Sequence, residues 1–206
     1  MSTKKKQQSS SVKNPLLYWI IASFIVGVML GCGFAQNPDS DLFKGTGLNQ
    51  EVARADTVLP KNVKLCFTPP SGCSAVIEDQ ISKAVSSIYV QAYGMTSPTI
   101  VDSLIKAHEK GVEVRVLLDK SNLQDKWSKR SLLIEAGVEV GIDKVSGIAH
   151  NKVIIIDKET VITGSFNFTR AADKRNAENV IIITDKSVAN EYLQNWLNRK
   201  SKNDFR

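Results

Sequence analysis

Beyond residue 60, the hydrophobic residues recur with two different periods. In 75–88, Val76, Ile77, Ile81 and Val85 stand mostly three or four positions apart, which is the spacing of one helix face. In 112–119, "VEVRVLLD", apolar and polar residues alternate as in a strand. The full pattern predicts strands over 63–67, 88–93, 112–119, 138–143, 152–157, 161–167 and 179–185, and helices over 75–88, 97–111, 125–137 and 186–200. This alternation, with nearly all-apolar last strands, is typical of an α/β sheet covered by helices on both faces.

The N-terminal region has the layout of an export signal. Several lysines precede residues 16–35, "LLYWIIASFIVGVMLGCGFA", which contain no charge. A basic segment followed by an apolar one is typical of a secretory signal, and this run is also long enough to span a bilayer. We therefore predict a cleaved signal peptide or a retained hydrophobic anchor helix in 1–35, a linker in 36–60 and one globular domain in 61–206. Because the lysines precede the apolar run, we predict that the N-terminus stays inside and the domain is exported. The domain would then be periplasmic, extracellular or membrane-anchored outside the cytoplasm.

The net charge of +6 restricts the partners only weakly. Four of the 27 basic residues and none of the 21 acidic ones precede residue 36, so the remainder carries a net charge of only +2. A globally basic nucleic-acid binder is therefore not indicated, although a local basic cleft stays open.

Two cysteines, Cys66 and Cys73, flank a predicted tight turn, "PPSG". The turn would bring the two thiols within disulfide range, and export would permit the bond; two free thiols are the alternative. A zinc site is not expected, because no nearby histidine or third cysteine completes a set of ligands.

The stretch "IAHNKVIIIDKETVITGSFNFT" places polar residues at the ends of two apolar strands. His150 and Lys152 are two positions apart and face the same side of a strand, as do Ser165 and Asn167 on the next. Gly164 has no side chain, so backbone or ligand can approach closely there. A hairpin would gather an imidazole, a cation and two neutral hydrogen-bonding groups into one patch. Such a set suits a phosphodiester, because the cation neutralises its oxygens and histidine can attack phosphorus.

Asp157 stands at an odd offset from His150, so simple alternation places it on the opposite face near the strand end. We expect it to hold the hairpin or a nearby backbone rather than to touch substrate.

The spacing of these residues resembles the HKD motif of the phospholipase D superfamily. It runs His150-x-Lys152, four residues, Asp157, six residues, then Gly164-Ser165-x-Asn167. The similarity extends over roughly residues 63–200 and looks most like the small, single-motif bacterial endonuclease branch. The resemblance implies the phospholipase D/nuclease fold, a mixed and mostly parallel sheet flanked by helices on both faces.

The resemblance also implies the site chemistry. His150 would attack phosphorus to give a covalent phosphohistidine, and Lys152, Ser165 and Asn167 would hold the phosphate. Glu178, in "RNAENV", takes the place of the glutamate that orients the histidine. The family needs neither a metal nor another cofactor, and none is expected here.

This mechanism needs a second histidine to protonate the leaving oxygen and then activate water. The chain has two histidines, and the other, His108, lies near the end of a predicted helix. Larger relatives carry two motifs in one chain. This chain carries one motif, so we expect a homodimer with the active site at the two-fold interface.

Three functions fit these observations. The first is an exported, metal-independent endonuclease acting on DNA or RNA. The second is phospholipase D-type hydrolysis of phospholipids, which uses the same chemistry. The third is a non-catalytic nucleic-acid-binding or membrane-tethered interaction protein, with candidate backbone-binding cations at Lys120, Lys126, Lys129, Arg130, Lys144, Arg170, Lys174 and Arg175.

Overall fold

The computed structural model describes residues 59–70, 72–200, 202–203 and 205. The predicted signal or anchor in 1–35, and all but the last two residues of the predicted linker, lie outside this part of the chain. Within the described residues, no helix combines the length and the hydrophobicity needed to cross a membrane.

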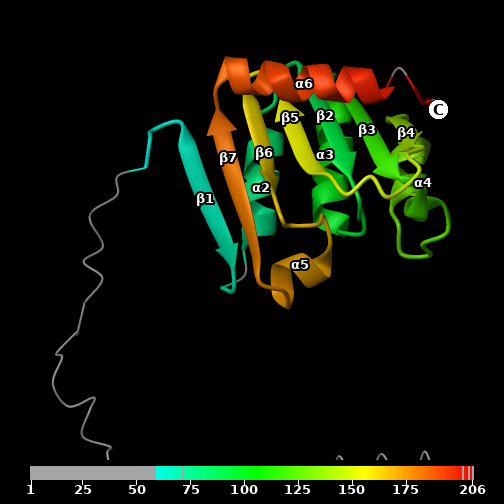
Figure 1. Ribbon diagram of the computed structural model, residues 1–206, viewed down its shortest axis with the longest axis horizontal. Coiled ribbons are helices and arrows are strands. Elements are labelled where there is room, and N and C mark those ends of the chain that lie inside the picture. The colour runs from blue at the N-terminus through cyan, green and yellow to red at the C-terminus, as the bar shows by residue number, and fades with distance from the viewer. Residues whose placement is uncertain (1–58, 71, 201, 204, 206) are drawn as a thin grey trace, which may run out of the picture. The chain divides into compact units, whose positions relative to one another are not determined.

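A seven-stranded mixed sheet forms the centre of the described region, in the order β1-β7-β6-β5-β2-β3-β4 (Figure 1). The strands are β1 (Val63–Thr68), β2 (Ser87–Ala92), β3 (Glu113–Asp119), β4 (Glu139–Asp143), β5 (Lys152–Ile156), β6 (Thr160–Gly164) and β7 (Glu178–Thr184). The sheet is mixed, as predicted, but parallel pairing is confined to β2-β3-β4, and the other neighbouring pairs are antiparallel. One reason is the short connection between β5 and β6, which allows a hairpin but no crossover.

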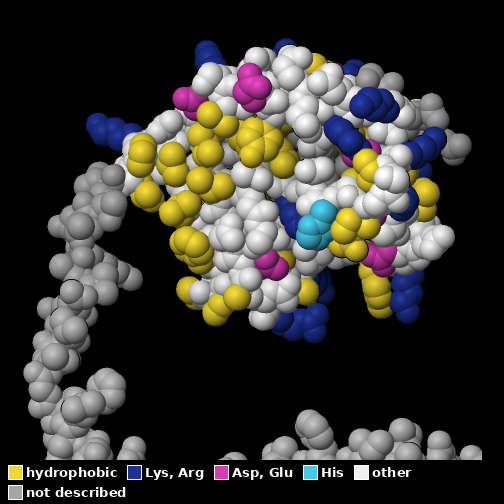
Figure 2. Space-filling view, in the orientation of Figure 1, with side chains coloured by type: hydrophobic (Ala, Val, Ile, Leu, Met, Phe, Trp, Pro, Cys, Tyr) yellow, Lys and Arg dark blue, Asp and Glu magenta, His cyan; other side chains and the backbone are white. Residues whose placement is uncertain are grey.

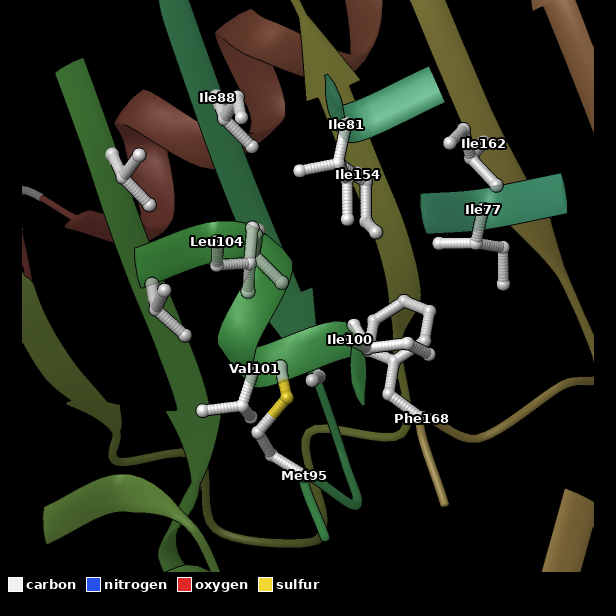
Figure 3. Close-up of a cluster of buried hydrophobic side chains, with 14 of the residues drawn as sticks. Ile77, Ile81, Ile88, Met95, Ile100, Val101, Leu104, Ile154, Ile162 and Phe168 are labelled. Carbon is white, nitrogen blue, oxygen red and sulfur yellow. The ribbon is translucent and has the colours of Figure 1, made fainter. Parts of the chain in front are cut away.

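Helices cover both faces of this sheet. On one face lie α2 (Cys73–Ser82), α3 (Pro98–Glu109), α4 (Arg130–Glu135) and α5 (Arg170–Lys174), whose buried residues belong to one hydrophobic cluster (Figure 3). On the other face lies α6 (Lys186–Lys200), which buries Ala189, Leu193 and Trp196 (Figure 1). The α/β layering predicted from the sequence is therefore confirmed.

Strand β5 shows how alternation builds the two layers. Ile154 and Ile156 belong to the cluster under α2 and α3, whereas Val153 and Ile155 belong to the cluster under α6. All four are at most 5% exposed, and burying one such side chain contributes roughly 1.5–3 kcal/mol. The apolar run therefore locks the strand from both sides, which fixes the residues at its two ends.

Two predicted helices are shorter than expected. The helix predicted over 75–88 ends at Ser82: Val85 is 82% exposed, and Ile88 is a core residue of β2. Only Arg130–Glu135 of the predicted 125–137 is α-helical. Its start is a turn in which the Asp125 carboxylate accepts a hydrogen bond from the Trp127 amide at 2.8 Å, a contact that competes with helix. The short α5 and a 3₁₀ turn, η1 (Lys120–Leu123), were not predicted.

Candidate active site

The motif residues lie where several strand ends meet at one edge of the sheet. The last residue of β2, Ala92, pairs with Lys152 at the start of β5. Gly164, at the end of β6, pairs with Val180 near the start of β7, where Glu178 pairs in turn with the last residue of β1. The antiparallel order of these strands thus brings sequence-distant segments to a single edge.

His150 lies two residues before the start of β5 and is exposed, whereas Lys152 is buried and only 6% exposed. A histidine side chain, cyan in Figure 2, lies at the surface beside hydrophobic side chains. The Lys152 Nζ donates a hydrogen bond to the carbonyl oxygen of His150 at 3.0 Å. Tyr93 joins this pair: its ring centroid is 4.8 Å from the imidazole in an edge-on contact and 5.3 Å from Nζ. The imidazole is therefore open to a ligand from outside, and a buried cation contacts the same tyrosine ring.

Burial lowers the pKa of Lys152, and attraction by the Glu178 carboxylate partly opposes the shift. A buried ammonium with few protein partners is costly unless an anion approaches it. Since Nζ makes one hydrogen bond within the part of the chain that the structure describes, it retains donors for phosphoryl oxygens.

Ser165 and Glu178 form a second polar group on the β6 and β7 ends. The Ser165 hydroxyl donates to the Glu178 carboxylate at 2.5 Å and accepts from the Asn179 backbone amide at 3.1 Å. Asn176 Nδ2 donates to the other Glu178 oxygen at 2.9 Å. The Glu178 carboxylate thus accepts from Ser165 and Asn176. It makes no hydrogen bond to the His150 imidazole in the described structure, although the family resemblance predicted such a bond. Its influence on Lys152 still places Glu178 within electrostatic range of the site.

Asn167 lies against Gly94. A Cβ at Gly94 would be 3.7 Å from Asn167 Oδ1 and 3.2 Å from a methyl group of Thr169, so the glycine leaves room for both side chains. The Oδ1 of Asn167 is buried and has no hydrogen-bond partner among the described protein atoms. The amide is therefore a polar group that a ligand can satisfy.

Gly164 is required by close backbone approach. Its φ is +146°, and a Cβ there would lie 2.2 Å from the backbone oxygen of Asn179. Any side chain would push β6 away from β7 and displace Ser165.

Asp157 lies at the far end of β5 from His150. Its carboxylate accepts hydrogen bonds from the backbone amides of Val85, Ser86 and Ser87 and from the Ser86 hydroxyl, at 2.7 to 3.2 Å. These contacts tie the β5–β6 turn to the chain entering β2, so the carboxylate holds backbone.

The Cys66 and Cys73 thiols are joined in a disulfide with a Cα–Cα distance of 5.7 Å. The turn that it closes contains Thr68, whose hydroxyl donates to the carbonyl oxygens of Ala172 and Asn176 and accepts from the amide of Glu178. The disulfide therefore borders the segment that presents Glu178.

The other histidine is remote from this edge. His108 is in the last turn of α3 and lines a hollow with Glu113 and Glu139, at the starts of β3 and β4. These strand starts lie at the opposite edge of the sheet from the end of β2. No group of histidine, cysteine or carboxylate side chains able to hold a metal ion occurs in the described part of the chain.

Sequence reasoning missed Tyr93, Thr68 and the two asparagines beside Glu178. Tyr93 directly follows β2, and its role depends on which strand pairs with β5, which the hydrophobic pattern does not reveal. The asparagines carry no spacing signal of their own.

Fold and site together define a phosphodiester-handling enzyme with an exposed imidazole, a buried lysine and neutral hydrogen-bonding groups at one sheet edge. A family model described as "Cardiolipin synthase, PLD-like domain" matches residues 77–200. The chain is 54% identical over 198 residues to "Phospholipase D" of Rickettsia felis, covering 93% of this chain and 98% of that protein. It is 33% identical to "Mitochondrial cardiolipin hydrolase" of Mus musculus, covering 62% of each.

Among solved structures, the phospholipase D family member Nuc from Salmonella typhimurium superimposes with a TM-score of 0.67 at 31% identity. The match covers 70% of this chain and 97% of Nuc. The chain belongs to the phospholipase D superfamily and is a phosphodiester hydrolase.

Proposed function

We propose that the protein hydrolyses its phosphodiester through a covalent phosphohistidine on His150. The observation that carries this proposal is the exposed His150 imidazole next to the buried Lys152, whose ammonium donates to the His150 carbonyl oxygen. The imidazole nitrogen attacks phosphorus, and the bond to the leaving oxygen breaks as that oxygen takes a proton. Lys152 and Asn167 neutralise and orient the phosphoryl oxygens. Water, deprotonated by a general base, then cleaves the phosphorus–nitrogen bond and returns free His150.

The proton donor in this scheme is His150 of a second copy of the chain. His108 is at the opposite sheet edge, so no second imidazole of the same chain reaches the site. A two-fold arrangement with both motif edges at the interface supplies one. Sedimentation velocity combined with activity measurements tests this: a fully active monomer would contradict it.

For the substrate we propose phospholipid head groups as the first candidate. The Rickettsia relatives that match nearly the whole chain carry the name phospholipase D. Apolar side chains on the segments bordering His150 add support: Ile148 is 59% exposed, Leu123 58% and Trp127 66%. Exposed large apolar groups beside a polar site suit an interfacial substrate.

Nucleic acid, the substrate favoured by sequence reasoning alone, is the second candidate. Its support is the similarity to the endonuclease branch and the exposed cations Lys126, Arg170 and Arg175. The two substrates share the bond to be cleaved, so only a direct comparison separates them.

The decisive assay offers the purified full chain phosphatidylcholine vesicles and plasmid DNA in parallel, each with EDTA. His150→Ala should abolish turnover of the true substrate, and His108→Ala, the matched control, should keep it. Activity retained in His150→Ala would contradict the nucleophile, and activity lost in EDTA would contradict metal independence.

We further propose that the domain acts outside the cytoplasm. The Cys66–Cys73 disulfide supports this, since such bonds persist in oxidising compartments. An alkaline phosphatase fusion to the C-terminus of the full chain should be active in cells; an inactive, cytoplasmic fusion would contradict export.

A further inference from the structure

His150 stands at the end of an irregular connection between β4 and β5. Residues 144–151 contain no helix or strand, and the side chain of Ile148 is exposed. An irregular segment has no ladder of its own to hold it, so the position of the imidazole depends on contacts that other segments make with this connection.

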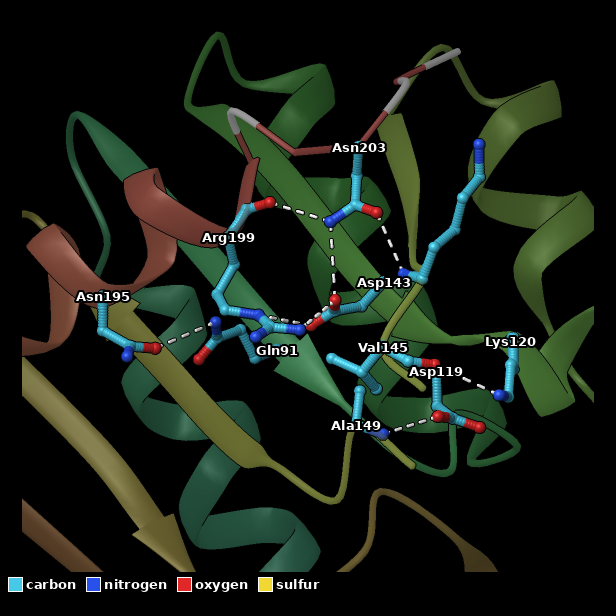
Figure 4. Close-up of polar contacts among 10 residues, drawn as sticks. Gln91, Asp119, Lys120, Asp143, Val145, Ala149, Asn195, Arg199 and Asn203 are labelled. Carbon is cyan, nitrogen blue, oxygen red and sulfur yellow. Dashed lines mark hydrogen bonds and ion pairs between the residues drawn. The ribbon is translucent and has the colours of Figure 1, made fainter. Parts of the chain in front are cut away.

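Asp119, the last residue of β3, holds the residue that directly precedes His150. Its carboxylate is 1% exposed and accepts from the backbone amide of Ala149 at 2.7 Å and from that of Ser121 at 2.9 Å (Figure 4). Ala149 directly precedes His150, so the peptide that leads into the imidazole residue is anchored to the rigid end of a central strand. Burial would raise the pKa of Asp119, but these amide hydrogen bonds outweigh it and the pKa is lowered, which keeps the carboxylate ionised.

The residues that follow Asp119 extend this anchorage. Lys120 Nζ donates to the carbonyl oxygens of Val145 and Ser146 at 3.2 and 3.3 Å. Asn122 Nδ2 donates to the carbonyl oxygen of Tyr93 at 2.7 Å, and Tyr93 is the residue whose ring meets the imidazole edge-on. The segment from Asp119 to Asn122 therefore holds two stretches of backbone: the connection that leads into His150, and Tyr93, whose ring contacts the imidazole.

A neighbouring aspartate provides a built-in comparison. Asp143, at the end of β4, is the register partner of Asp119 and is 2% exposed. Its carboxylate binds Arg199, and Asn203 Nδ2 donates to it, so it holds the C-terminal helix rather than the His150 connection (Figure 4). The two carboxylates are thus neighbours of similar burial, but Asp119 holds backbone amides whereas Asp143 holds an arginine side chain.

We propose that Asp119 is a positioning residue for the reaction, which sets the location of the His150 imidazole through the Ala149 amide. The proposal rests on the proposed function of His150 as nucleophile. It does not give Asp119 any contact with substrate. Displacement of a reacting group by about 1 Å lowers turnover on the order of 100-fold, so a positioning residue acts on kcat.

The test compares Asp119→Ala and Asp119→Asn with Asp143→Ala and Asp143→Asn in the full chain. The probe is bis(p-nitrophenyl) phosphate, which lacks both lipid and base, and kcat and KM are measured well below each variant's Tm. Asp119→Ala should lose roughly 10- to 100-fold in kcat with KM changed less than about threefold. Asp119→Asn, which keeps one acceptor oxygen, should lose less. The Asp143 variants should lower Tm while kcat stays within about threefold.

A second readout separates positioning from general loosening. Hydrogen exchange followed by mass spectrometry should accelerate in residues 145–151 of the Asp119 variants and near the C-terminus in the Asp143 variants. If Asp119→Ala does not fold, Lys120→Met, which loses only the two carbonyl contacts of an exposed side chain, should still show a smaller fall in kcat. Equal kcat in the Asp119 and Asp143 variants, or a normal kcat in Lys120→Met with faster exchange in 145–151, would overturn the proposal.

The two proposals fail in different ways. If His150→Ala keeps its activity on the probe, the nucleophile is wrong and the positioning proposal loses its basis. If His150→Ala is inactive and the Asp119 variants behave like the Asp143 variants, only the positioning proposal is wrong.

Discussion

The carboxylate of Asp157 offers a direct test of how the β5–β6 turn is held. Its side chain accepts from three consecutive backbone amides and one hydroxyl, and its own backbone has a φ of +53°. Asp157→Gly removes the carboxylate while keeping a backbone that adopts this φ freely. Asp157→Ala removes the carboxylate but keeps a Cβ in the left-handed region, as the wild-type aspartate does.

The expected cost follows from the burial of the donors. A typical hydrogen bond contributes about 0.5–1.5 kcal/mol and one to a charged group about 1.5–3 kcal/mol. Val85 and Ser86 are exposed, so water replaces the carboxylate there, and each hydrogen bond is assigned the lower range of about 0.5–1.5 kcal/mol. Ser87 is 3% exposed, so its amide loses the larger amount. Together these give a loss of about 3–5 kcal/mol for Asp157→Gly, and Asp157→Ala should lose roughly 1 kcal/mol more because of its φ.

The measurement is urea unfolding of wild type and both variants, followed by tryptophan fluorescence, to which the buried Trp196 contributes. Turnover is measured in parallel at low temperature, where all three remain folded, and kcat should change less than about threefold. Asp157→Gly with wild-type stability would contradict the anchoring role. A stable Asp157→Gly without activity would instead show that the carboxylate takes part in the reaction.

The pH dependence provides an independent check. Burial would raise the pKa of Asp157, but the hydrogen bonds from Ser87, Val85 and Ser86 outweigh it and lower the pKa. A lowered folded pKa means that the stabilisation is complete above the unfolded value of about 3.9 and is lost as the pH falls towards the folded value. The stability gap between wild type and Asp157→Gly should therefore shrink below about pH 4.

Three further outcomes are expected. Replacing Cys66 and Cys73 together by serine should lower the free energy of unfolding by about 2–3 kcal/mol, the loop-closure value for a sequence separation of 7, as measured in urea. Lys152→Met should reduce kcat/KM by roughly 100- to 1,000-fold without lowering Tm, because it removes a buried charge; a fall in Tm would contradict the cost assigned to its burial. Gly164→Ala should abolish activity and destabilise the fold by more than Gly111→Ala, whose φ is also positive but whose Cβ would meet nothing within 4 Å.

The sequence predicted much of this molecule because its strongest signals are local. The strands of the β5–β6 hairpin and helix α6 follow from apolar periodicity, and the observed α6 runs from Lys186 to Lys200 as predicted. The strand predicted over 161–167 instead ends at Gly164, so Ser165 and Asn167 lie beyond β6. The boundary between α2 and β2 was placed wrongly because Val85 and Ile88 continue the helical spacing by coincidence. Long-range contacts set this boundary: the Asp157 carboxylate accepts from the amides of residues 85–87, and β2 pairs with β3 and β5.

The candidate site also has a part that local sequence spacing predicts and a part that depends on long-range contacts. The spacing of His150, Lys152, Ser165 and Asn167 is a one-dimensional signal, and these residues do lie at one edge of the sheet. The partners of Glu178 depend on where Asn176 and Thr68 are brought by the order of β1, β7 and β6, so the hydrogen bonds of its carboxylate did not follow from spacing.

The β5–β6 turn also limits how the chain tolerates insertions and deletions. The turn has two consecutive residues of positive φ, Asp157 and Lys158, and it sets the pairing of Ile156 with Thr160. Inserting or deleting one residue in this turn would shift the pairing of β5 with β6 by one position and exchange the two faces of one strand. Lys152 or Ser165 would then point away from the rest of the site. Homologous chains should therefore keep the length of this turn, and length should vary in exposed connections such as 124–127.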